Sequence, residues 1–283
     1  MPVEPKDAAT LILLRRCEPA HGEAFEVLMV RRNEDQKFAP GAYVFPGGTL
    51  DPGDYGPAAE NMCAGLDRKT AEGMLDEIRY PGRVLGFWVA ALRETFEEVG
   101  LLMAYNEKRC LISCDSAAMA ARFSGYRRNL LAGTVTFPAI LEAEGLTLAT
   151  DRLRYMAHWI TPEILPIRFD VRFFVAEAPP GQHAIHHDGE LLEHEWIGPK
   201  EALARYEKGH FPMVLPTLVT VEELAKYGSL EDVLTSTEEK KVEGILTRLQ
   251  IDEDEGIVEY FPDGSARKNL AASVPSVEKR KRF

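Results

Sequence analysis

Residues 84–100, VLGFWVAALRETFEEVG, carry the strongest helical pattern of this chain. Wound at about 100° per residue, the segment gathers six apolar side chains on one side: Leu85, Trp88, Val89, Leu92, Phe96 and Val99. Such a stripe is typical of a helix that packs on a core. We therefore predict a helix from about residue 83 to residue 99, ending at Gly100 because glycine commonly follows a helix end.

Three carboxylates of this segment, Glu94, Glu97 and Glu98, lie together on roughly the opposite side. Like charges at this spacing cost about 0.2–0.5 kcal/mol per pair, and the helix dipole repels anions from the last turn. A bound divalent cation would reverse both effects, and Mg²⁺ fits because it is hard and prefers oxygen ligands. A solvated acidic helix face is the alternative interpretation.

The segment FAPGAYVFPGG, residues 38–48, precedes this helix and is rich in glycine and proline. It predicts turns joined by a short strand. Gly47 and Gly48 permit the close approach of another backbone or of a ligand, because they lack a β-carbon. An ordinary turn is the alternative.

Outward from these segments, strands and helices are mixed without a regular βαβ alternation, which favours the α+β class. Strand patterns cover residues 10–16, 25–32, 154–160, 168–176 and 191–197. Helical patterns cover residues 67–79, 116–131, 138–144, 199–207 and 215–227. Residues 256–264 predict a small hairpin with a Pro-Asp-Gly turn, and the basic tail 278–283 is interpreted as a solvated or flexible end rather than a binding arm.

Composition narrows the class of protein. With 283 residues, 45% hydrophobic and 28% charged, the chain is long enough for one elaborated domain or two small ones with a real core. A net charge of −12 argues against nucleic-acid binding. No apolar run approaches the roughly 20 residues of a membrane span, and no signal-peptide pattern is present. We expect a cytoplasmic protein whose four cysteines are free thiols.

Two motifs together resemble the Nudix box, G-x5-E-x7-R-E-U-x-E-E-x-G-U, where U is aliphatic. GTLDPGD at residues 48–54 is similar to its first half, and RETFEEVGL at residues 93–101 to its second half. Thr95 stands where an aliphatic residue is usual, and Asp54 where the family has Glu. The spacer between the halves holds 38 residues, 55–92, instead of seven, so about 31 are inserted.

An interrupted box of this kind resembles the branch of peroxisomal coenzyme A diphosphatases and their bacterial relatives. The likeness continues in residues 38–48, 159–162, 168–174 and 193–196, and covers roughly residues 8–227. It implies a Nudix fold, an α/β/α sandwich around a mixed sheet with helical insertions. The implied domain spans 8–230, with one insertion at about 56–82 within the box and a second helical insert at about 107–150. Residues 231–283 would form a C-terminal extension.

The resemblance also implies a reaction. Members hydrolyse nucleoside diphosphates linked to another group, with Mg²⁺ or Mn²⁺ on the box helix and water attacking a phosphorus. Carried onto this chain, the metal ligands are Glu94, Glu97 and Glu98, which are also expected to be catalytic. Arg93 is expected to orient them, as a partner of Asp54 or of a neighbouring Glu, with a plain surface salt bridge as the alternative.

The general base and the substrate ligands are less defined. Glu98 is the first choice of base, and Glu193 or Glu195, from the stretch after residue 185, is the alternative. That stretch also contains His186, His187, Glu190 and His194, and its histidines are interpreted as exposed loop residues rather than metal ligands. Expected substrate-binding residues are Arg31, Arg32, Arg168, Arg172, Gly47 and Gly48, with ion pairing at the sheet edge as the alternative for Arg168 and Arg172. The second insert carries Arg122, Arg127 and Arg128, and either shapes specificity or covers the sheet.

The sequence therefore predicts a Mg²⁺-dependent pyrophosphohydrolase, with a CoA-type substrate as first choice. ADP-ribose, NADH and dinucleoside polyphosphates remain alternatives, as does a non-catalytic Nudix-like nucleotide-binding domain. We expect a small-molecule substrate, no nucleic-acid or membrane partner, and a homodimer.

Overall fold

The computed structural model describes residues 2–17, 23–75, 78–185, 191–238, 240–252 and 256–268. The predicted basic tail at 278–283 lies outside these residues, as do His186, His187 and Glu190. Within the described ranges, no helix has both the length and the apolar character needed to cross a membrane.

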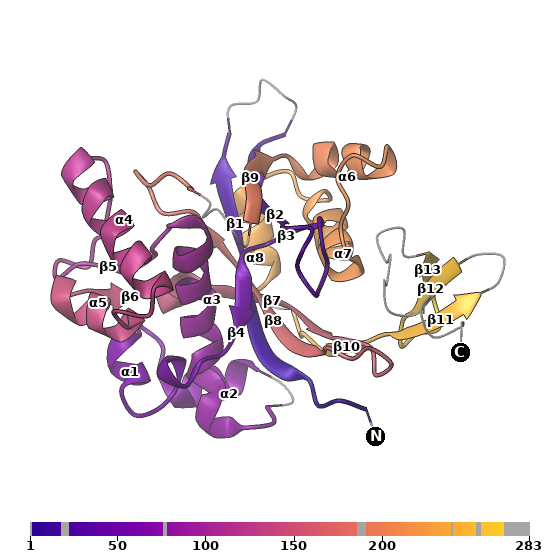
Figure 1. Ribbon diagram of the computed structural model, residues 1–283, viewed down its shortest axis with the longest axis horizontal. Helices are drawn as coiled ribbons and strands as arrows, with labels where there is room; N and C mark the ends of the chain where they lie inside the picture. The colour runs from indigo at the N-terminus through magenta and orange to yellow at the C-terminus, as the bar shows by residue number, and fades with distance from the viewer. Residues whose placement is uncertain are drawn as a thin grey trace.

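A mixed sheet of eight strands forms the centre of the molecule (Figure 1). Its order is β10-β7-β8-β1-β2-β3, with β4 paired to β1 and β9 paired to β2. The pairs β1–β8 and β7–β10 are parallel, and the other neighbours are antiparallel. The strands are β1 (Lys6–Arg16), β2 (Phe25–Arg32), β3 (Tyr43–Val44), β4 (Gly47–Thr49), β7 (Arg154–Ile160), β8 (Phe169–Glu177), β9 (Leu191–Ile197) and β10 (Gly244–Leu246).

Helices cover both faces of this sheet. The first face carries α1 (Ala59–Met62), α2 (Arg68–Met74), α3 (Val84–Val99), α4 (Ala117–Leu131) and α5 (Phe137–Glu144). The second carries α6 (Pro199–Glu207), α7 (Leu215–Leu224) and α8 (Leu230–Ser236). Each face has its own hydrophobic cluster, because neighbouring residues of a strand point to opposite sides. The expected α/β/α sandwich around a mixed sheet, and the α+β class, are confirmed.

Strand β1 shows why the sheet is buried on both faces. Its central run Leu11, Ile12, Leu13 and Leu14 is fully buried. Leu11 and Leu13 belong to the cluster of the first face, whereas Ile12 and Leu14 belong to the cluster of the second. A continuous apolar run is what a strand covered on both sides requires.

Both insertions lie on the first face, around α3. The box insertion forms α1 and α2, and the second insert forms α4, α5 and the strand β6 (Thr147–Leu148). β6 pairs with β5 (Ala104–Tyr105), which lies just before the insert. The helix predicted at 67–79 is shorter than expected, because α2 ends at Met74. Leu75 takes an extended backbone and is buried in the same cluster, so burial of this side chain ends the helix.

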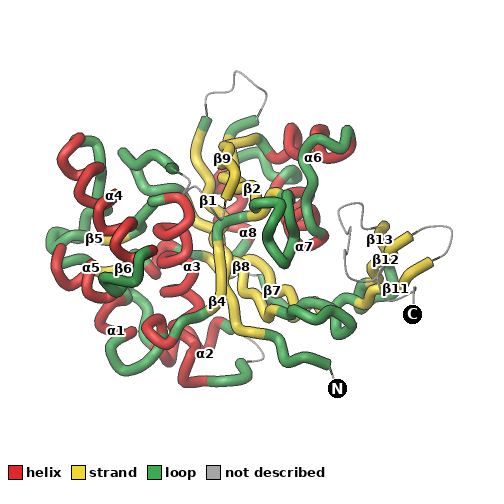
Figure 2. The backbone as a smooth tube through the Cα atoms, in the orientation of Figure 1, coloured by secondary structure: helices red, strands yellow, loops and turns green. Residues whose placement is uncertain are grey.

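The C-terminal part of the chain is divided between the sandwich and a separate sheet (Figure 2). The predicted hairpin is confirmed as β12 (Gly256–Tyr260) and β13 (Ala266–Lys268), and β11 (Arg248–Asp252) pairs on its other side. By contrast, α8 packs in the second hydrophobic cluster and β10 pairs with β7. The domain boundary at about residue 230 stays a prediction, but the chain beyond it still packs against the sandwich, and Phe261 contacts the Trp159 ring.

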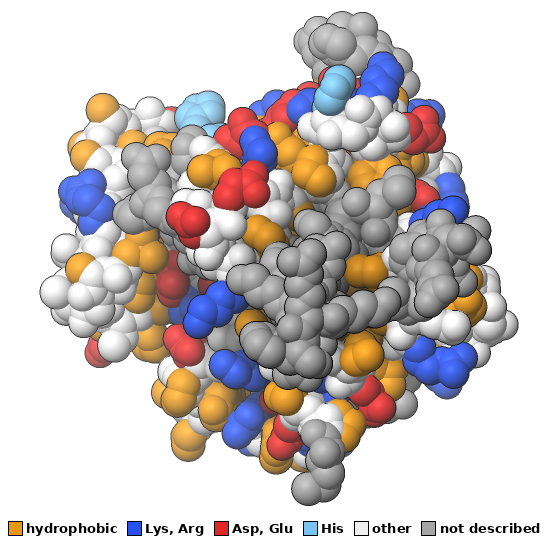
Figure 3. Space-filling view, turned by 45° about the vertical axis from the view of Figure 1, so that its right-hand side comes forward, with side chains coloured by type: hydrophobic (Ala, Val, Ile, Leu, Met, Phe, Trp, Pro, Cys, Tyr) orange, Lys and Arg blue, Asp and Glu red, His pale blue; other side chains and the backbone are white. Residues whose placement is uncertain are grey.

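Charged side chains of both signs are interspersed with hydrophobic ones on the face shown in Figure 3. The four cysteines, Cys17, Cys63, Cys110 and Cys114, all lie within the described residues and are free thiols.

Candidate active site

Arg93 joins the two halves of the interrupted box. It lies on α3 with only 5% of its surface exposed, beside Asp54, which is 2% exposed. Its Nε and Nη2 donate to the two oxygens of Asp54 at 2.8 and 2.9 Å, and Nη2 also donates to the Thr49 carbonyl at 2.9 Å. A bidentate arginine–carboxylate pair is a strong and directional contact. The two motifs separated by the insertion are therefore adjacent in space.

The remaining nitrogen of Arg93 faces the carboxylates of its own helix. Nη1 donates to Glu94 at 2.8 Å and to Glu97 at 3.1 Å. The guanidinium of Arg93 is therefore paired with three carboxylates, those of Asp54, Glu94 and Glu97. Burial raises the pKa of Glu94 to about 7, against the lowering effect of Arg93. Burial also raises the pKa of Glu97 and of Asp54. With three carboxylates around one guanidinium, the cluster has more acidic groups than cations.

Glu98 points toward the glycine-rich loop. Its carboxylate accepts a hydrogen bond from the Gly47 amide at 3.0 Å, and the residue is 7% exposed. A β-carbon on Gly48 would lie 2.5 Å from the Glu94 carboxylate, and one on Gly47 would lie 2.5 Å from the Ala9 carbonyl. Gly47 is therefore required for the close packing of this loop against β1, and a larger residue at position 48 would displace the Glu94 carboxylate.

The donor chemistry of this cluster fits a hard divalent cation, because it consists of carboxylate oxygens with uncompensated charge. In the part of the chain that the structure describes, however, no three His, Cys, Asp or Glu side chains converge closely enough to hold a metal ion. The contacts give the reason: Arg93 binds Glu94 and Glu97, while the Gly47 amide binds Glu98. The carboxylates of Glu94, Glu97 and Glu98 are therefore suitable metal ligands by their chemistry. In this structure they are hydrogen-bonded to Arg93 and to the Gly47 amide instead.

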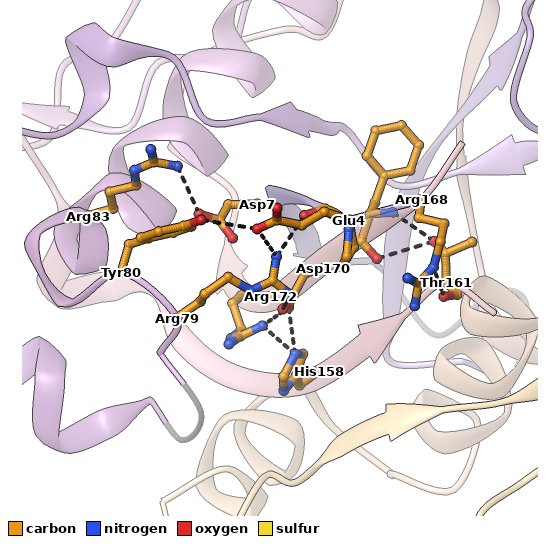
Figure 4. Close-up of polar contacts among 12 residues, drawn as sticks. Glu4, Asp7, Arg79, Tyr80, Arg83, His158, Thr161, Arg168, Asp170 and Arg172 are labelled. Carbon is orange, nitrogen blue, oxygen red and sulfur yellow. Dashed lines mark hydrogen bonds and ion pairs between the residues drawn. The ribbon is translucent and has the colours of Figure 1, made fainter. Parts of the chain in front are cut away.

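Arg168 and Arg172, expected to bind phosphates, are buried among protein partners (Figure 4). Arg168 donates to the Thr161 carbonyl at 2.9 Å and to the Val3 carbonyl at 2.6 Å. Arg172, 1% exposed, contacts Asp170 and the ring of His158, whose Nε2 lies 2.7 Å from Asp170. Arg172 is thus ion-paired with Asp170, as the alternative expected, whereas the partners of Arg168 are backbone carbonyls. A phosphate would have to displace these contacts, and the assignment of both arginines to the substrate stays a prediction.

Arg31 and Arg32 are neighbours on β2 and point to opposite faces. Arg31 donates to the Gly41 carbonyl at 3.3 Å and to Glu34 at 3.1 Å. Arg32 donates to the Phe38 carbonyl at 3.0 Å. Both arginines therefore brace the loop before the box, and their assignment to the substrate stays a prediction.

Glu193 and Glu195 lie on the second face of the sheet, away from α3. They pair with Arg31 and Met29 of β2, and Met29 belongs to the hydrophobic cluster of the second face. Glu193 accepts a hydrogen bond from the Tyr43 hydroxyl, and Glu195 accepts one from Arg205 of α6. Neither carboxylate is brought together with the box carboxylates.

Like Leu191 at the start of β9, His194 and Trp196 lie on the face of α3. They pair with Val30 and Leu28, which belong to the cluster of the first face. The sequence analysis did not single out Trp196, although the alternation of side chains along 191–197 separates it from Glu193 and Glu195. Period-two alternation was the signal that could have found it.

A hollow of about 420 Å³ lies between the ends of β1 and β8, the loop that follows β8, and β9. Its charged and aromatic side chains are Arg15, Arg16, Glu177, His183, His194 and Trp196. The loop that forms one wall is joined to the box helix, because the Ile185 amide donates to the Val99 carbonyl at 2.8 Å. The guanidinium of Arg15 lies 4.6 Å from the centre of the Trp196 ring. The hollow therefore combines an aromatic surface with cationic groups.

Known proteins are similar to this chain in sequence and in fold. No protein-family model matches the chain. It is 24% identical over 253 residues to the acyl-coenzyme A diphosphatase NUDT19 of Gallus gallus, a match that covers 78% of this chain and 66% of that protein. The Homo sapiens protein of the same name is 25% identical over 245 residues, covering 76% of this chain and 64% of that protein. The chain thus spans slightly under two thirds of the length of these two relatives.

Among solved structures, a NUDIX hydrolase from Alicyclobacillus acidocaldarius is similar to this chain with a TM-score of 0.67. The two are 27% identical, and the match covers 84% of this chain and 99% of the bacterial one. The chain therefore has the Nudix fold, and its resemblance to Nudix hydrolases, including acyl-coenzyme A diphosphatases, is confirmed.

Proposed function

We propose that this chain is a Nudix-type hydrolase that cleaves the phosphoric anhydride of a nucleoside diphosphate linked to a second group, with Mg²⁺ or Mn²⁺. The observation that carries the proposal is the reassembly of the box around Arg93, which brings Asp54 to the helix that holds Glu94, Glu97 and Glu98. This cluster has more carboxylates than cations, as a site for a divalent metal and a phosphate-bearing substrate requires.

We assign the roles as the resemblance to the Nudix box implies, and the contacts support them. Glu94, Glu97 and Glu98 would hold the metal, which when bound supplies polarisation of phosphoryl oxygens and a lowered pKa for water. Arg93 fixes the orientation of Asp54, Glu94 and Glu97 through charge-assisted hydrogen bonds. Glu98 is our candidate for the general base, because the Gly47 amide binds one of its oxygens and fixes the direction of the carboxylate.

A CoA-type substrate is our first choice, and the names of the curated relatives support it. ADP-ribose, NADH and dinucleoside polyphosphates remain in the panel, because fold likeness does not select a substrate. We propose that the hollow lined by Trp196 receives the nucleotide end of the substrate, because the Trp196 ring can stack on a base. Trp196→Ala should then raise KM about tenfold, as expected for the loss of one base–aromatic stack, and leave kcat nearly unchanged.

The test is a hydrolysis panel on the full chain. CoA, acyl-CoA, ADP-ribose, NADH and a diadenosine polyphosphate are incubated with Mg²⁺ or Mn²⁺, and the products are identified by mass. Metal-dependent cleavage of one compound at its anhydride would support the proposal and name the substrate class. Absence of turnover, with the fold intact and the nucleotides bound, would instead support a non-catalytic nucleotide-binding domain.

The predicted homodimer is tested separately by light scattering. A monomeric mass at micromolar protein concentration would contradict it.

A further inference from the structure

The C-terminal end of α3 is completed by a side chain from another part of the chain. The last four carbonyls of a helix have no partner within it. Two of them, those of Glu97 and Glu98, accept hydrogen bonds from the guanidinium of Arg127, Nε to Glu97 at 2.8 Å and Nη2 to Glu98. The other two accept backbone amides, Phe96 from Gly100 at 3.0 Å and Val99 from Ile185 at 2.8 Å.

Arg127 comes from α4 in the second insert and is 7% exposed. Its third donor, Nη1, binds the carbonyl of Ile185, so one guanidinium joins α4, the end of α3 and the loop after β8. A cation at the C-terminal end of a helix is also favoured by the helix dipole.

We propose that Arg127 is a positioning residue, which holds the last turn of the box helix so that the carboxylates of Glu97 and Glu98 are placed for the metal. This inference rests on the proposed function of that site. Both residues bound through their backbone by Arg127, Glu97 and Glu98, also present carboxylates to the site. Without Arg127, two buried carbonyls lose their partners, and the turn that carries both carboxylates loses its support.

A positioning role and a purely electrostatic role predict opposite changes in metal affinity when Arg127 is lost. Removing a positive charge near Glu97 and Glu98 should tighten the binding of a divalent cation, if charge alone matters. Removing the support of the last turn should weaken it, by about the 10–100-fold seen when groups that orient metal ligands are lost. The sign of the change therefore separates a positioning role from an electrostatic one.

The experiment compares Arg127→Met, Arg127→Lys and Arg128→Met in the full chain. Arg128 is the next residue on α4 and is exposed, so its replacement is the matched control. Mn²⁺ binding is measured directly by calorimetry, and kcat and KM are measured at saturating metal. We expect Arg127→Met to weaken Mn²⁺ binding at least about tenfold and to lower kcat more than it raises KM. Arg127→Lys keeps the positive charge but cannot bind all three carbonyls, so it should recover only part of the lost Mn²⁺ affinity and kcat.

Amide hydrogen exchange gives a readout that does not depend on metal or turnover. The amides of residues 96–100 and of Ile185 should exchange faster in both Arg127 variants than in Arg128→Met. Unchanged exchange, or Mn²⁺ binding in Arg127→Met as tight as in the parent, would overturn the positioning role. Faster exchange in a chain that binds no Mn²⁺ and hydrolyses nothing would instead contradict the proposed function and leave Arg127 as a structural support of the helix end.

Discussion

Arg93 and Arg172 are both almost fully buried and both contact the first face of the sheet, yet their surroundings differ in charge. Arg93 is the cation for Asp54, Glu94 and Glu97. Arg172 shares Asp170 with His158 and lies 5.1 Å from the Phe87 ring of α3. The first cluster has an excess of carboxylates.

The second cluster continues in a chain of ion pairs that is rich in arginine (Figure 4). Arg79 lies 3.9 Å from Asp170, and Arg83 lies 3.4 Å from Asp7. Burial would raise the pKa of Asp170, but His158 and Arg172 outweigh burial and lower it. The opposite balance at Glu94 leaves its pKa at about 7. Burial of an arginine alone does not mark a functional site, and the uncompensated charge around it is the better signal.

The largest expected effect is on turnover at the box. Glu98→Gln should lower kcat by about 10²–10⁴-fold, the range of a lost general base, while the fold is kept because the amide of Gln still fits beside Gly47. Steady-state kinetics on the substrate found in the panel, with circular dichroism as the fold control, checks this. Turnover equal to that of the parent would remove Glu98 as the base.

Next in size is the response of stability to metal. Arg93→Met leaves buried carboxylates without their cation and should lower the free energy of unfolding by about 3–5 kcal/mol. Arg172→Met should cost less, about 1–3 kcal/mol, because Asp170 keeps His158 and Arg79. Added Mg²⁺ should recover part of the loss in Arg93→Met and none in Arg172→Met, measured by urea denaturation. Equal responses to Mg²⁺ would erase the contrast between the two clusters.

A smaller effect is expected from pH at Glu94. Its folded-state pKa of about 7 lies above the ordinary 4.5, so between these values the folded chain holds a proton that the unfolded chain releases. This contribution to stability is full below about pH 4.5 and is lost as the pH rises through about 7. The metal-free parent should therefore lose stability across that window relative to Glu94→Gln.

Metal binding should show the reverse dependence at the same residue. Because a carboxylate ligand must lose its proton, Mn²⁺ affinity should fall by about tenfold per unit below pH 7 in the parent. Calorimetry at several pH values checks this, and a parent whose affinity is flat from pH 6 to 8 would contradict it.

The smallest effect is expected on the opposite face. Glu193→Gln and Glu195→Gln should each change kcat by no more than about twofold, the range of ordinary surface substitutions, because these carboxylates bind Tyr43 and Arg205. A loss of turnover comparable to that of Glu98→Gln would move the general base to β9.

The box helix could be predicted closely from sequence. The expected range was 83–99, the observed one is Val84–Val99, and Gly100 takes the left-handed conformation with φ of 73° that its position as a helix stop implies. Regular amphipathic spacing and a glycine stop are local signals, which explains why they survive into the structure. The box resemblance likewise identified Asp54 as a partner for Arg93, which the contacts show.

Side-chain partners across the fold were less predictable. Arg168 and Arg172 were expected on one strand face, but the sequence could not tell that both side chains are buried, Arg172 against Phe87 of α3 and Arg168 against the carbonyls of Thr161 and Val3. Arg127 was one of three arginines of a helix, and its partners lie in segments distant in sequence. A helical stripe through Met119, Phe123, Tyr126, Arg127 and Leu130 would have marked it as an arginine at a core position.

The short strand β10 has a consequence for the behaviour of the chain in solution. It pairs with His158, Trp159 and Ile160 at the end of the sheet where β7 would otherwise be outermost. Unpaired strand edges act as templates for pairing with other chains, and natural proteins shield them. Residues 244–246 therefore shield the edge of β7 from pairing with other chains. A chain cut before Gly244 would expose that edge, and other copies could extend the sheet there.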